Sequence, residues 1–224
     1  MRRLDTVAHA ATAPAPGEID EHHWTATGLN SRKVAIWAFI GSECLFFASL
    51  ISTYLVYRGK SLVGPLPHEE SQCMLHGKMQ ACDPIFSIPL VTFGTAVLLF
   101  SSFFVVLALN GAQRGDRKAL LTWLTATVIC GLFFIGMQVY EFNHFYHKGL
   151  GYSTNLFGST FYTLTGFHGA HVTLGGIWLT TMLILAVRGK VPPEKSLNLE
   201  MAALYWHFVD VVWIVIFPVV YLMR

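Results

Sequence analysis

The chain has 224 residues, of which 54% are hydrophobic and only 12% are charged, with a formal net charge of +2. A soluble domain usually carries about twice that charged fraction. The apolar residues also fall in long blocks, so the composition excludes an ordinary soluble protein and predicts an integral membrane protein.

The first segment, "MRRLDTVAHAATAPAPGEIDEHHW", begins with basic residues, but no apolar signal-peptide core follows them. We therefore expect no signal peptide. Residues 1–32 are expected to form a polar N-terminal tail, and residues 33–224 a membrane domain.

Long apolar segments follow in chain order, each long enough to cross the hydrocarbon core as a helix. We expect an all-α integral membrane protein, a bundle of five transmembrane helices at about 34–57, 85–109, 119–140, 161–187 and 202–223. Pro218 lies inside the last segment and predicts a kink there, which neighbouring helices can accommodate.

The basic residues orient the bundle. With the N-terminus inside, ten of the 15 Lys and Arg residues fall on the inner side and five on the outer side. Cytoplasmic segments carry the excess of these residues, so we expect a cytoplasmic N-terminus. Cys73 and Cys82 then share the outer loop between the first two spans, where an oxidising compartment favours a disulfide over two free thiols.

Polar side chains inside the spans are few, and burying an ionisable group in hydrocarbon costs at least a few kcal/mol. Glu43 lies about 14 Å into the first helix at 1.5 Å per residue. The others lie in the three later spans or at their ends: Gln138, Glu141, His144, His168, His171, Glu200, His207 and Asp210.

A metal site is one interpretation of these residues. Glu141 and His144 have the spacing that di-iron bundles use, and His168 and His171 could face one ion. However, a di-iron site needs a second such repeat and further carboxylates, which the sequence lacks. A b-type haem between two histidines stays open as an alternative, and we expect no metal in this chain.

Interhelical hydrogen bonding is the simpler interpretation, because His, Thr and Asn side chains commonly join helices in lipid. It suits His168, His171, His207 and Asp210. Glu43 is harder to explain in this way, since no other charged residue shares its helix near that depth. It needs a proton, a partner on another helix, a lipid headgroup or water.

Four motifs follow one another along the chain: "IWAFIGSECLFFASL" (36–50), "QVYEF" (138–142), "FYTLTGFHGAHVTLGG" (161–176) and "YWHFVDVVWIVIFPVVYL" (205–222). Together they resemble one family, subunit III of the haem-copper terminal oxidases. The resemblance covers about residues 33–224 in order and leaves out the tail before Arg32.

The resemblance implies an accessory, non-redox subunit of an aerobic, proton-pumping cytochrome c oxidase in the prokaryotic cytoplasmic membrane. Such a subunit packs on catalytic subunit I, binds phospholipid and supports proton uptake and stability during oxygen reduction. It implies no catalytic residue and no cofactor in this chain, with haem and copper in partner subunits. Subunits I and II and phospholipids are the expected partners, and no nucleic acid is expected.

The resemblance also implies two groups of site residues. Lipid binding or support of proton uptake is expected of Glu43, His168, His171 and Glu200. An interhelical polar network is expected of Gln138, Glu141, His207 and Asp210.

The chain departs from the long form of that subunit in two respects. Two helices before the glutamate helix are absent, and the outer loop 59–87 is long enough to dock a further respiratory-chain subunit. Subunit III of a quinol oxidase and a homologue that accompanies nitric oxide reductase remain alternatives. A small stand-alone transporter with a site around Glu43 and His207 is a third, although no internal repeat supports it.

Overall fold

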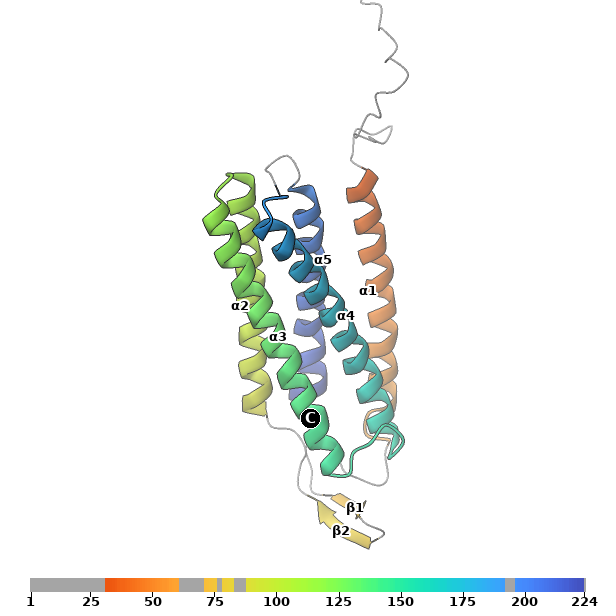
Figure 1. Ribbon diagram of the computed structural model, residues 1–224. Coiled ribbons are helices and arrows are strands. Elements are labelled where there is room, and N and C mark those ends of the chain that lie inside the picture. The colour runs from red at the N-terminus through yellow and green to blue at the C-terminus, as the bar shows by residue number, and fades with distance from the viewer. Residues whose placement is uncertain (1–30, 61–70, 76–77, 83–87, 192–195, 224) are drawn as a thin grey trace, which may run out of the picture.

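The computed structural model describes residues 31–60, 71–75, 78–82, 88–191 and 196–223, with only the backbone described in the two short segments. Its helices are α1 (Ser31–Tyr57), α2 (Ile88–Gln113), α3 (Arg117–His147), α4 (Leu156–Val187) and α5 (Leu197–Phe217), which continues into η2 (Pro218–Leu222). Within these described residues, five helices are long and apolar enough to span a membrane. The predicted five-helix membrane bundle is confirmed (Figure 1).

Several helices extend beyond their expected limits. α3 continues seven residues past Tyr140 to His147, because no glycine or proline interrupts it before Gly149, whose φ is 87°. α4 begins at Leu156 rather than Phe161, since the Asn155 side chain accepts a hydrogen bond from the Gly158 amide and caps its first turn. Apolar length locates a span but not its polar ends.

The turn between α2 and α3 is tight. Gly115 has a φ of 73°, and Asp116 accepts hydrogen bonds from the amides of Lys118 and Ala119. A Cβ added to Gly111 would lie 2.8 Å from the Leu120 backbone nitrogen, so the two chains approach closely there. This close approach fixes α2 and α3 as an antiparallel pair.

α5 forms the centre of the bundle and contacts α1, α2 and α4. In Figure 1 it lies behind α4, between α2 and α1. Trp206 and Trp213, seven residues apart, are almost completely buried, and their Nε1 atoms donate hydrogen bonds to Ser101 and Thr95 of α2. Both indole rings therefore pack in the core with their polar atoms satisfied.

The last helix changes at Pro218, where a kink was expected. The α-helix gives way to the π-helical turn η2, which buries Val220 and Tyr221. Proline cannot donate a backbone hydrogen bond, and the wider turn accommodates that loss. At the same end of the bundle, the Arg58 guanidinium donates to the Met223 carbonyl.

A short antiparallel hairpin lies between α1 and α2, an element that the all-helical expectation did not include. Its strands are β1 (Ser71–Leu75) and β2 (Lys78–Cys82), with Cys73 opposite Gln80 and Cys82 opposite Ser71. Their side chains lie outside the described part of the structure, so the disulfide stays a prediction. The tail boundary at residue 32 and the cytoplasmic N-terminus also stay predictions, because residues 1–30 are not described.

Candidate functional site

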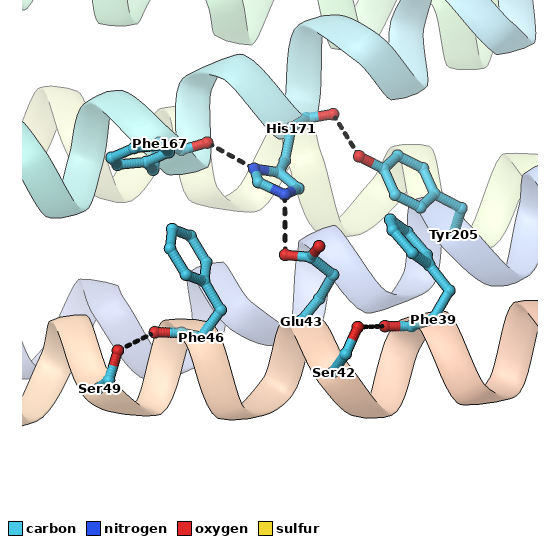
Figure 2. Close-up of polar contacts among 8 residues, drawn as sticks. All are labelled: Phe39, Ser42, Glu43, Phe46, Ser49, Phe167, His171 and Tyr205. Atoms are coloured by element: carbon cyan, nitrogen blue, oxygen red, sulfur yellow. Dashed lines mark hydrogen bonds and ion pairs between the residues drawn. The ribbon is translucent and has the colours of Figure 1, made fainter.

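Glu43 of α1 and His171 of α4 meet within the membrane-spanning part of the bundle. Glu43 Oε2 lies 3.2 Å from His171 Nε2, with 20% and 13% of the two side chains exposed. Figure 2 shows the carboxyl pointing from α1 toward the imidazole. Of the histidines expected near Glu43, this one supplies its partner.

The hydrogen bonds of His171 define where its protons lie. Nδ1 is 2.7 Å from the Phe167 carbonyl oxygen, and a carbonyl can only accept, so Nδ1 carries a proton. A hydrogen bond between Nε2 and Glu43 Oε2 then needs one further proton, on either atom. Besides the proton on Nδ1, this contact accommodates one proton, which either the carboxyl or the imidazole can carry.

Aromatic rings surround this pair. Phe47 packs edge-on against the His171 ring at 5.0 Å between centroids, and Phe46 packs edge-on against Phe167 at 5.1 Å. The Tyr205 hydroxyl of α5 lies 3.4 Å from the His171 carbonyl oxygen (Figure 2). These rings cover part of the pair, and 20% of the Glu43 side chain remains exposed.

His168, one turn before His171, points elsewhere. It is completely buried, and its ring stacks on Trp213 at 4.8 Å between centroids. Neither ring nitrogen has a hydrogen bond within the described residues. The structure therefore places His168 in the aromatic core, away from the Glu43 pair, and its expected lipid or proton role stays a prediction.

Glu200 also lies apart from Glu43, near the start of α5. Its Oε1 is 2.7 Å from Lys33 Nζ of α1, and the two side chains are 30% and 43% exposed. This ion pair joins α1 and α5 at the predicted inner end. Its lipid or proton role likewise stays a prediction.

Two of the four residues expected in an interhelical network connect α3 to other elements. Gln138 Nε2 donates to the Thr165 carbonyl of α4 at 2.9 Å. The Tyr221 hydroxyl of η2 donates to Glu141 Oε2 at 3.1 Å, while Glu141 Oε1 has no partner among the described residues. These two contacts lie on α3 but do not form one connected chain.

The other two residues, on α5, face α2. His207 Nδ1 lies 2.6 Å from Ser102 Oγ. Asp210 is 2% exposed, and neither carboxyl oxygen makes a hydrogen bond within the described residues. His207 thus makes an interhelical contact, while Asp210 is buried beside it without one.

Several partners in these contacts were missed by sequence reasoning. Serine and threonine are common in every span, so nothing distinguished Ser101, Ser102 and Thr95 as partners of the α5 residues. Tyr221 depends on the π-helical turn, which helical spacing does not predict. The seven-residue spacing of Trp206 and Trp213 was the one signal available for the face of α5 turned toward α2.

The described helices define a multi-pass membrane protein in which a carboxyl–imidazole pair joins two of the spans. The sequence model of the family "Cytochrome c oxidase subunit III" matches residues 16–224. The chain belongs to this family, which makes it an accessory subunit of a haem-copper oxidase in a prokaryotic membrane, associated with other oxidase subunits. The match begins within the tail, well before the region that the motifs covered.

The relatives include subunits of cytochrome c oxidases and subunits of quinol oxidases. The chain is 37% identical over 214 residues to cytochrome c oxidase subunit 3 of Bacillus sp. (strain PS3), covering 96% of this chain and 94% of that protein. It is 37% identical to quinol oxidase subunit 3 of Bacillus subtilis (strain 168), covering 85% of this chain and 86% of that protein. Cytochrome bo(3) ubiquinol oxidase subunit 3 of Pseudomonas aeruginosa is 34% identical to this chain, covering 96% of this chain and 95% of that protein.

Proposed function

We propose that this chain is subunit III of an aerobic, proton-pumping cytochrome c oxidase, a translocase that couples oxygen reduction to proton movement. Within it, the chain packs on subunit I and contacts subunit II and phospholipids. It carries no redox cofactor, and the haem and copper belong to the partner subunits. Loop 59–87 is proposed to dock a further subunit of the respiratory chain.

The observation that carries this proposal is the Glu43–His171 pair. Its geometry allows one proton to be carried by either of two groups, and both side chains remain partly exposed. Such a pair can take up a proton from an adjoining headgroup or water and release it again. We propose that it supports proton uptake by the catalytic subunit, so that the complex stays active through many turnovers.

Substituting Glu43 tests this function in the assembled complex. Glu43→Gln keeps a hydrogen bond, because the amide N–H can donate to His171 Nε2, but it removes the exchangeable proton. Glu43→Ala removes both. We expect both variants to assemble and to lose activity during sustained turnover several-fold sooner than the unmodified complex.

Ser42→Ala is the matched control, since Ser42 is exposed and its hydroxyl bonds only within α1. It should leave the active lifetime unchanged. An unchanged lifetime for Glu43→Gln, with a shortened one for Glu43→Ala, would assign Glu43 a packing role instead.

Quinol oxidation is the second candidate, favoured by the identities of 37% and 34% to quinol oxidase subunits. The Bacillus PS3 protein supports cytochrome c, because it is 37% identical over 96% of this chain, against 34% over the same share for the Pseudomonas aeruginosa ubiquinol oxidase subunit.

A further inference from the structure

One face of α5 is left open by its neighbours. α5 lies between α1 and α2 (Figure 1), and in the described part of the chain these two helices make at most marginal contact with each other. Val211 and Ile214 on this face are 57% and 47% exposed. His207, one turn before Val211, continues the same stripe and is half-buried. Below, "the α5 face" means His207, Val211 and Ile214.

His207 stands at a depth where hydrocarbon would be expected. It lies ten residues after Leu197, about 15 Å into a span of hydrocarbon about 30 Å thick. Its Nδ1 is bonded to Ser102, but its Nε2 makes no hydrogen bond within the described residues. Lipid tails offer no hydrogen-bonding group, so an imidazole nitrogen turned toward them costs free energy.

The contact with Ser102 does not supply a hydrogen-bond partner for His207 Nε2. Ser102 Oγ lies 2.6 Å from His207 Nδ1, and a serine hydroxyl can either donate a hydrogen bond to that nitrogen or accept one from it. In the first arrangement Nε2 carries a proton and donates outward; in the second, Nδ1 carries the proton and a neutral ring accepts outward through Nε2.

We infer that the α5 face is the docking surface for a transmembrane helix of another oxidase subunit. That helix presents a hydroxyl or a carboxamide to His207 Nε2, because these groups both donate and accept. Val211 and Ile214 pack against its apolar side chains. The inference rests on membership of the oxidase subunit III family, and it is independent of the role proposed for Glu43.

Photo-crosslinking in the complete complex tests the surface. A photoreactive amino acid is placed at Val211 or Ile214, and at the controls Ile129 of α3 and Ile177 of α4, which are 60% and 59% exposed. After illumination of native membranes, adducts are identified by mass spectrometry. We expect the two α5 positions to join another oxidase subunit and the controls to join lipid.

Three crosslinking outcomes would overturn the inference. They are adducts of the α5 positions with lipid alone, adducts with a second copy of this chain, and protein adducts at equal yield from all four positions. The first would make this face a lipid surface, the second an interface between copies, and the third would remove its selectivity.

Substitutions of His207 test the hydrogen bond. We expect His207→Phe to retain the partner about 3- to 30-fold less well in detergent, from the measured range for hydrogen bonds between membrane helices. His207→Gln should largely restore retention, since a carboxamide also donates and accepts.

Ser102→Ala separates docking from internal folding, because it removes the Ser102–His207 contact and leaves the imidazole on the surface. The Ser102→Ala variant should retain the partner subunit nearly as well as the unmodified chain does. A loss as large as that of His207→Phe, or full retention by His207→Phe, would refute the docking bond.

Discussion

At the scale of single residues, the carboxyls between the helices differ in how they are accommodated. Glu43, which is partly exposed, contacts an imidazole, whereas the buried Glu141 depends on one tyrosine and the buried Asp210 has no hydrogen bond in the described residues. Burying a carboxyl in apolar surroundings is costly unless hydrogen bonds replace those to water. Glu43 and Glu141 therefore leave their local structure sensitive to the loss of the one group that each contacts.

Tyr221→Phe should expose this sensitivity at Glu141. Among the described residues, the substitution removes the one hydroxyl bonded to Glu141 and leaves a carboxyl that is 3% exposed without a hydrogen bond. We expect a loss of about 1–3 kcal/mol in the free energy of unfolding, seen as a lower melting temperature of the purified complex.

Tyr140→Phe is the control for Tyr221→Phe, because Tyr140 is 62% exposed on the same helix as Glu141. It should leave the melting temperature within about 1 °C, since exposed substitutions rarely change stability. Equal melting temperatures for both variants would show that the Tyr221 hydroxyl contributes nothing to stability.

At the scale of elements, the packing of α5 depends on small residues that let its tryptophans enter. A Cβ at Gly131 of α3 would lie 2.8 Å from the Trp206 ring, and one at Gly175 of α4 would lie 3.0 Å from it. The ring thus fills the space between two helices while its Nε1 bonds Ser101 of the third. Four helices are joined by one side chain.

Gly131→Ala should therefore be destabilising, although alanine is the better helix former. The rigid ring cannot retreat, because Gly175 limits it on the other side. Overpacking of this kind costs about 1–3 kcal/mol, measurable as a lower midpoint of thermal unfolding.

Gly136→Ala, five residues further along α3, has nothing within 4 Å of the added Cβ and should be neutral or slightly stabilising. A neutral Gly131→Ala would mean that α3 and α5 can separate at no cost, against the close packing seen here.

How far the sequence predicts this arrangement differs from residue to residue. The five spans and the depth of Glu43 follow from apolar length, which the membrane thickness imposes. The choice of His171 rather than His168 as its partner depends on how α4 is rotated, and helical spacing does not determine that rotation. Ser102 and Tyr221 were missed for the same reason, since their contacts are set by tertiary packing and by the π-helical turn.

At the scale of the whole molecule, the chain is one part of a larger oxidase, and the electron donor is a property of that assembly. We expect the purified complex to consume oxygen with reduced cytochrome c as the donor and only slowly with a quinol. Oxygen consumption with each donor, normalised to haem content, measures this preference. A higher rate with the quinol would group the complex with the quinol oxidases.

The attachment of α1 has a consequence for how the bundle could come apart. Only 17% of its most apolar stretch is buried, yet polar contacts hold it at three depths, through Lys33 to Glu200, Glu43 to His171 and Arg58 to the Met223 carbonyl. Apolar burial resists separation gradually, but each polar contact is lost in one step. α1 would therefore detach in stages, beginning with the exposed pair of Lys33 and Glu200, which salt screens most readily.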